Sequence, residues 1–80
     1  MILIYGKSGC PHCVEAKALA ESKGLQYTYT SIGQDMMLED FKELFPNART
    51  VPQIIVDGVN IGGYAEFREW VNSQPSFLAG

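Results

Sequence analysis

Two cysteines stand three residues apart in the stretch CPHC, at positions 10 and 13. The chain holds no other cysteine, and its single histidine, His12, lies between the two. Only a thiolate attacks a disulfide, and a second thiol nearby can resolve the mixed disulfide that forms. The pair therefore indicates thiol–disulfide exchange, with Cys10 and Cys13 as the reacting groups.

The residues around the pair predict how the cysteines are placed. Pro11 is typical of the first position of a helix, so Cys10 should occupy the cap position before it. Unpaired backbone N–H groups and the positive end of the helix dipole favour an anion there. Thiols at such sites have a pKa of roughly 3.5 to 7.5 instead of about 8.5. Cys13, one turn further in, should be more covered and should resolve the mixed disulfide on Cys10.

Four other uses of a cysteine pair compete with this one. A structural disulfide would close a very short loop and would remove little entropy from the unfolded chain. Structural zinc needs four ligands, whereas the chain offers two thiolates and one histidine close together. A small soft-metal carrier for Cu(I) also places such a pair after a first strand, and it stays open as an alternative. Iron–sulfur carriage is disfavoured, because Pro11 stiffens the motif.

The apolar pattern predicts an α/β fold of order βαβαββα. Strands are expected at 1–5, 25–32, 52–57 and 59–61, and helices at 11–24, from 37 or 38 to 45, and from 64 to about 73. Asp57-Gly58 is a strong two-residue hairpin signal between the last two strands. The first strand, helix and second strand form a right-handed parallel crossover. We expect one domain over residues 1–80, a mixed four-stranded sheet with its three helices on both faces, and a loosely ordered tail at 74–80.

The helices should bury apolar stripes. For the first helix these are Val14, Ala16, Leu19 and Ala20; for the second, Met37 or Leu38, Phe41, Leu44 and Phe45; for the third, Tyr64, Phe67, Trp70 and Val71.

Composition narrows the function classes. With 46% apolar and 19% charged residues, the chain is that of an ordinary globular domain. A net charge of −3 does not indicate binding to nucleic acid. No apolar run is long enough to span a membrane. The first residues lack a basic leader, and cysteines are few, so we expect a cytoplasmic monomer. Lys7 and Arg49, near the motifs, could attract an anionic small ligand.

Four features stand in one order along residues 1 to about 73: Lys7, Cys10-Pro11-His12-Cys13, Thr50-Val51-Pro52-Gln53 and Gly62-Gly63-Tyr64. Together they resemble a glutaredoxin, a small thiol oxidoreductase of the thioredoxin-like fold. The resemblance implies a cis Val51-Pro52 bond, which would leave the N–H and C=O of Val51 free to pair with a peptide laid across the cysteines. It also implies that no metal or organic cofactor is bound and that glutathione is the co-substrate.

A glutathione site follows from the same resemblance. It would comprise Lys7, His12, Arg49, Thr50, Val51, Pro52, Gly63, Tyr64, Ala65 and Glu66. Lys7 and Arg49 would meet the glycyl carboxylate, and the N–H groups of Tyr64, Ala65 and Glu66 would hold the γ-glutamyl carboxylate. Each residue also has an ordinary explanation, such as a solvated cation, a tight turn or a favourable helix-dipole contact.

The sequence departs from the family pattern in two places. Glu66 stands where many glutaredoxins have aspartate, which makes contact with the ammonium of glutathione uncertain. His12 stands where tyrosine is usual. A protonated His12 would stabilise the Cys10 thiolate and make the disulfide more oxidising.

The expected activity is reduction of protein disulfides and glutathione mixed disulfides. Ribonucleotide reductase is a substrate suggested only at the level of the family. Within the same class, a glutaredoxin-like hydrogen donor reduced by thioredoxin reductase is the alternative. The Cu(I) carrier is the alternative from a different class.

Overall fold

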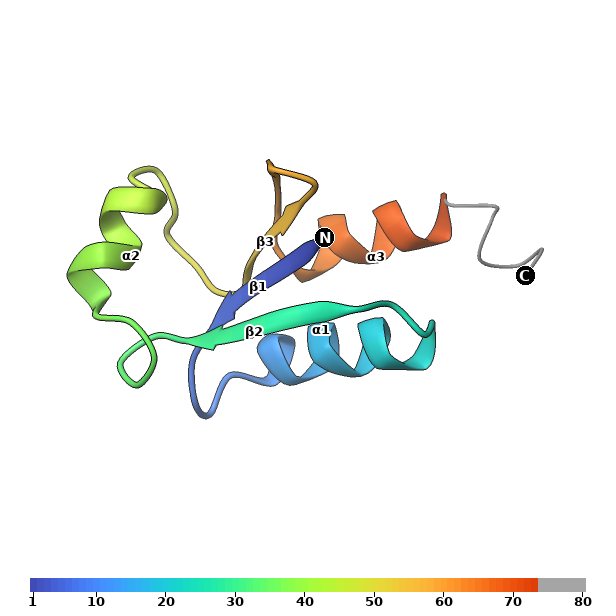
Figure 1. Cartoon of the computed structure of the whole chain (residues 1–80), viewed down its shortest axis with the longest axis horizontal. Coiled ribbons are helices and arrows are strands. Elements are labelled where there is room, and N and C mark those ends of the chain that lie inside the picture. The colour runs from blue at the N-terminus through green and yellow to red at the C-terminus, as the bar shows by residue number, and fades with distance from the viewer. Residues whose placement is uncertain (74–80) are drawn as a thin grey trace.

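A computed structural model describes residues 1–73 of the chain and has the predicted element order (Figure 1). The elements are β1 (Ile2–Gly6), α1 (Pro11–Ser22), β2 (Tyr27–Ser31), α2 (Leu38–Leu44), β3 (Gln53–Val56), β4 (Val59–Gly62) and α3 (Tyr64–Asn72). The expected tail at 74–80 lies outside the described residues. The order βαβαββα is confirmed, and observed boundaries differ from the expected ones by a few residues.

The four strands form one mixed sheet in the order β2-β1-β3-β4. β1 runs parallel to β2 and antiparallel to β3, so that Ile4 lies opposite Tyr29 on one side and Ile54 on the other. β3 and β4 form the predicted hairpin, with Asp57 and Gly58 in the left-handed region at φ 51° and 86°. β1 lies in the centre of the sheet, and its last residue, Gly6, directly precedes the loop that leads to Cys10.

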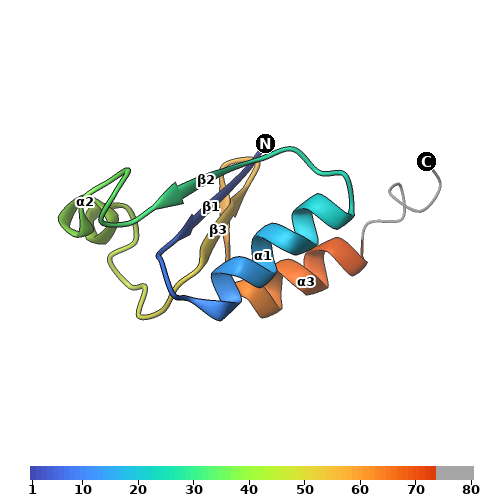
Figure 2. The same ribbon diagram turned by 90° about the horizontal axis from the view of Figure 1, so that it is seen from below.

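The hydrophobic core lies between the sheet and two of the helices. Figure 2 shows α1 and α3 side by side on one face of the sheet. Ile4, Ile54 and Phe67 are fully buried there. On α1 the buried stripe consists of Cys13, Ala16 and Ala20, whereas Val14 is 64% exposed, so its predicted place in the core was wrong. The stripe includes Cys13 because the start of α1 packs against the end of β1.

The second helix packs differently from the prediction. α2 lies beyond one end of the sheet instead of across its second face (Figures 1 and 2). Phe41 and Phe45, four residues apart, are buried, and Phe45 meets the Tyr5 ring edge-on at 5.1 Å. Leu44 is 57% exposed, and Met37 and Leu38 are exposed as well, so the prediction that they face the core was wrong. A short helix that touches only the end of a sheet can bury one narrow stripe.

Candidate active site

Cys10 caps the N-terminus of α1, as the sequence predicted. Its backbone is extended, and its sulfur accepts a hydrogen bond of 3.2 Å from the Cys13 backbone N–H. Pro11 occupies the first helical turn, and Gly9, with φ 74°, turns the preceding loop back toward the helix. The Cα atoms of Cys10 and Cys13 are 5.2 Å apart and their sulfurs are at disulfide distance. The pair is thus built to open and close a disulfide.

The two sulfurs differ in access. Cys10 retains 8% of its surface, whereas Cys13 is fully buried. A thiolate that arrives from solvent therefore meets Cys10. Cys13 can react only with Cys10, from the protein side, which is the asymmetry expected of a nucleophile and a resolving thiol.

The loop before β3 lies against the Cys10 sulfur. The Val51-Pro52 peptide bond is cis, as the resemblance implied. The Val51 carbonyl oxygen is 3.7 Å from Cys10 Sγ. The buried Gln53 holds this loop, because its side-chain amide donates a 2.9 Å hydrogen bond to the Thr50 carbonyl. Val51, which precedes β3, is left with its backbone beside the sulfur.

A groove of about 280 Å³ runs beside the disulfide. It is lined by eight of the ten predicted glutathione residues, namely His12, Thr50, Val51, Pro52, Gly63, Tyr64, Ala65 and Glu66. They come from the start of α1, the loop before β3 and the start of α3, which are far apart in the sequence. The structure therefore brings together segments that the motifs singled out separately.

The other two predicted residues, Lys7 and Arg49, line an adjoining recess of about 260 Å³. Thr50 and Val51 belong to both hollows, so the recess continues the groove. Lys42 of α2 also lines it. Within residues 1–73 none of these three cations forms an ion pair. The sequence pattern could not predict that Lys42 lines this recess, because the position of its side chain depends on how α2 packs.

The start of α3 offers backbone donors to the groove. The first N–H groups of a helix have no partner within it, and here they belong to Tyr64, Ala65 and Glu66. The Glu66 carboxylate folds back, and Oε1 accepts a 2.9 Å hydrogen bond from the Gly63 N–H. At Gly62, with φ 113°, a Cβ atom would come within 3.0 Å of the Glu66 side chain. Glu66 therefore has a capping role, and its second oxygen has no hydrogen bond within residues 1–73.

His12 has two partners in the structure. Its Nδ1 is 3.2 Å from a carboxylate oxygen of Glu15, and its ring stacks on Tyr64 with centroids 5.9 Å apart. The expected electrostatic effect of His12 on Cys10 is thus shared with Glu15, a residue that the sequence analysis did not single out. The i,i+3 spacing on a helix is the signal that could have identified it.

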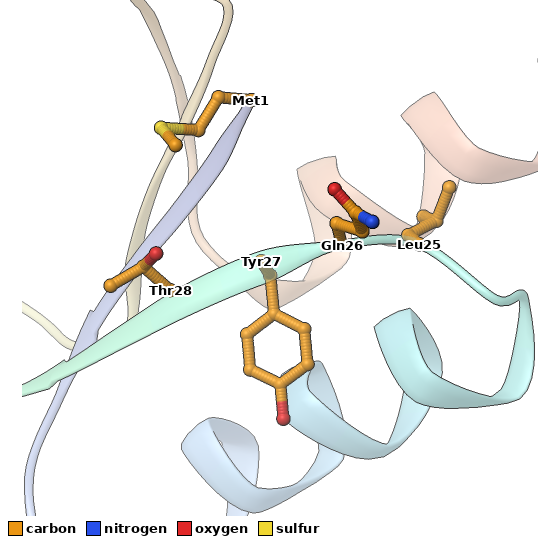
Figure 3. A pocket seen from close by; sticks show the side chains of 5 residues that line it. All are labelled: Met1, Leu25, Gln26, Tyr27 and Thr28. Atoms are coloured by element: carbon orange, nitrogen blue, oxygen red, sulfur yellow. The ribbon is translucent and has the colours of Figure 1, made fainter.

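A larger hollow, about 500 Å³, lies at the opposite end of the sheet from the cysteines. Figure 3 shows its lining residues, Met1, Leu25, Gln26, Tyr27 and Thr28, around the start of β2. It contains no thiol and no acid, so it offers none of the chemistry described above. In the described part of the chain, no group of three or more histidine, cysteine or acidic residues could hold a metal. No helix within residues 1–73 is long and apolar enough to span a membrane.

Comparison with known proteins gives a consistent result. A family model for glutaredoxin matches residues 2–61. Glutaredoxin 1 of Escherichia coli is 43% identical over 76 residues, which cover 86% of this chain and 89% of that protein. The glutaredoxin of Haemophilus influenzae is 38% identical over 85 residues, with 98% of each chain covered.

Solved structures agree with the sequence matches. Reduced E. coli glutaredoxin superimposes with a TM-score of 0.75 at 40% identity, covering 94% of this chain and 96% of that one. A buckwheat glutaredoxin–glutathione complex superimposes with a TM-score of 0.74, covering 89% of this chain and 67% of that one. At 24% identity, this second likeness shows the shared fold.

Proposed function

Because the chain belongs to the glutaredoxin family and is a thiol–disulfide oxidoreductase, we propose that it uses glutathione to reduce protein disulfides and glutathione mixed disulfides. The observation that carries the proposal is the groove. It is lined by Val51, whose carbonyl lies beside Cys10 Sγ, and by the first residues of α3, whose N–H groups have no partner within the helix. Both could pair with a bound peptide. A peptide thiol with carboxylates at both ends matches these donors and the cations beyond them.

The charges support a tripeptide that lies along the groove. Glutathione carries two carboxylates and one ammonium. Its glycyl carboxylate would meet Lys7 and Arg49 in the recess, with Lys42 as a third cation. Its γ-glutamyl carboxylate would meet the N–H groups of Tyr64 and Ala65. The buckwheat glutaredoxin was solved in complex with glutathione, which supports glutathione as the co-substrate proposed here.

The proposed cycle begins with the Cys10 thiolate. It attacks a protein disulfide or the disulfide of a glutathionylated cysteine, and one thiolate leaves. With a protein disulfide, Cys13 attacks Cys10, closes the internal disulfide and releases the second substrate thiolate. Two glutathione thiols then reopen the disulfide, the first forming a mixed disulfide with Cys10 and the second leaving with it as oxidised glutathione. With a glutathionylated substrate, a second glutathione clears the adduct on Cys10 directly, and Cys13 is not needed.

We propose the protein partners only by their chemical class. They are proteins with accessible disulfides or glutathionylated cysteines, with ribonucleotide reductase as a family-level candidate. Since glutathione recycles the pair, we place the protein in a reducing cytoplasm, as a monomer without a bound cofactor.

Two variants test the role of the cysteines. In a glutathione mixed-disulfide assay, Cys10→Ser should abolish turnover, because it removes the one thiol of the pair that solvent reaches. Cys13→Ser should retain it while losing reduction of protein disulfides. Loss of both activities in a folded Cys13→Ser protein would contradict the proposed cycle.

A second experiment tests the reductant. The oxidised wild-type protein is incubated with glutathione and, separately, with thioredoxin reductase and NADPH. We expect glutathione to reduce it efficiently. Reduction by thioredoxin reductase alone would favour the hydrogen-donor alternative. Tight Cu(I) binding by the reduced pair without exchange catalysis would favour a metal carrier.

A further inference from the structure

We propose that the Tyr29 hydroxyl donates a hydrogen bond to the Cys13 thiolate that forms when the disulfide opens. This inference rests on thiol–disulfide exchange and not on the identity of the reducing thiol. It assigns a function to a residue that the motifs around the cysteines do not include.

The geometry at Gly6 brings the two groups together. A Cβ atom built on Gly6 would lie 2.8 Å from Cys13 Sγ and would collide with the Tyr29 hydroxyl oxygen. Both atoms are therefore within 3.0 Å of one point, which places them no more than about 6 Å apart. Tyr29 reaches this place from β2, since it lies opposite Ile4 in the register and Gly6 is two residues further along β1. The missing side chain at Gly6 leaves the space between them open.

A Cys13 thiolate requires a hydrogen-bond donor. Cys13 is fully buried, so an anion on its sulfur cannot be stabilised by surrounding bulk water. A buried charge is costly unless it is hydrogen-bonded. Within residues 1–73 no hydrogen bond reaches the Cys13 sulfur, since the bond donated by the Cys13 N–H goes to Cys10 Sγ.

The Tyr29 hydroxyl is available for this contact. With the disulfide closed, it has no hydrogen bond to any of residues 1–73, whereas the Tyr27 hydroxyl donates a 2.6 Å bond to Glu21. Burial raises the pKa of the Tyr29 hydroxyl above its ordinary value, which keeps it protonated as a donor near neutral pH. The Lys17 ammonium lies 4.6 Å from the centre of the Tyr29 ring. This cation–π contact helps to hold the Tyr29 ring in place.

An incoming thiolate attacks Cys10 Sγ and forms a new sulfur–sulfur bond. The Cys10–Cys13 bond breaks, and its electron pair stays on Cys13 Sγ. The Tyr29 O–H donates a hydrogen bond to this thiolate, and the proton that later neutralises it comes from water. In the reverse direction the Cys13 thiolate attacks Cys10 in a mixed disulfide, and the substrate sulfur leaves with the electron pair.

The experiment measures the pKa of Cys13 as the only thiol, in the full-length Cys10→Ser protein, by NMR of isotopically labelled cysteine. Adding Tyr29→Phe should raise this pKa by about one unit, a tenfold loss of thiolate at a given pH. Replacing Tyr29 with a ring-fluorinated tyrosine, which keeps its shape and is a stronger donor, should lower it. The matched control is Tyr27→Phe, on the same strand but bonded to Glu21, which should leave it unchanged.

The outcomes separate the proposal from a purely structural role. An unchanged Cys13 pKa in a folded Tyr29→Phe protein would overturn it, and so would an equal shift in Tyr27→Phe. Should Tyr29→Phe not fold, the fluorinated protein decides, and an unchanged pKa there overturns the proposal. None of these measurements contains glutathione, so they stand apart from any failure of the proposed co-substrate.

Discussion

Replacing Gly6 with alanine should destabilise the protein, although the backbone there accepts any residue. Gly6 is buried in β1 and is not among the residues with positive φ. Without backbone strain, a glycine to alanine change stabilises by about 0.4 to 1 kcal/mol, because the unfolded chain loses freedom. Against this gain, the new Cβ would lie 2.8 Å from Cys13 Sγ and 3.0 Å from Cys13 Cβ.

The steric cost outweighs the gain. Cys13 is fully buried and tied to Cys10, so its atoms cannot move away freely. Overpacking of this kind costs about 1 to 3 kcal/mol. The net loss should be about 1 to 2 kcal/mol, which for a domain of this size lowers the melting temperature by roughly 4 to 15 °C.

Thermal unfolding of the oxidised full-length protein, followed by circular dichroism, measures this effect. Gly63→Ala is the matched control, since a Cβ there would be 3.4 Å from the Pro52 carbonyl oxygen, an ordinary contact. Its stability should stay within about 0.5 kcal/mol of wild type. A Gly6→Ala protein as stable as wild type would refute the packing described around Cys13.

Two further predictions concern the groove. Glu66→Ala should cost about 1 kcal/mol of unfolding free energy, because the Gly63 N–H loses its acceptor, whereas Glu66→Gln should keep that stability. Denaturant titration checks both, and an equal loss in the two variants would contradict the capping role. His12→Tyr should raise the Cys10 pKa and make the reduction potential more negative, and Glu15→Gln should act in the opposite direction. Unchanged potentials in both variants, measured against glutathione redox buffers, would reject this electrostatic role.

Much of the fold could be predicted because local signals agreed with the packing. Pro11 marks the start of α1, and Gly24, with φ 68°, follows its end. Asp57-Gly58 sets the β3–β4 hairpin, because its two residues readily adopt positive φ. These signals need no knowledge of distant contacts.

The inward face of α2 could not be predicted in the same way. Its segment carries apolar residues around more than one side of the helix, and Tyr5 decides which of them are buried. Since Tyr5 is distant in sequence, periodicity alone gave Leu44 the wrong environment.

Some residues of the site could be predicted from the sequence and others could not, for the same reason. Its cysteines and groove segments were identified from motifs, as each lies in a recognisable stretch. Lys42 and Tyr29 were not identified as site residues, because an ordinary helix and an ordinary strand carry them to the site only through tertiary packing.

We expect the cap of α1 to keep Cys10 ionised near neutral pH. The most direct test is the rate of Cys10 alkylation against pH in the reduced Cys13→Ser protein. The midpoint should lie between roughly 3.5 and 7.5. A midpoint near the ordinary thiol value of about 8.5 or higher would contradict it.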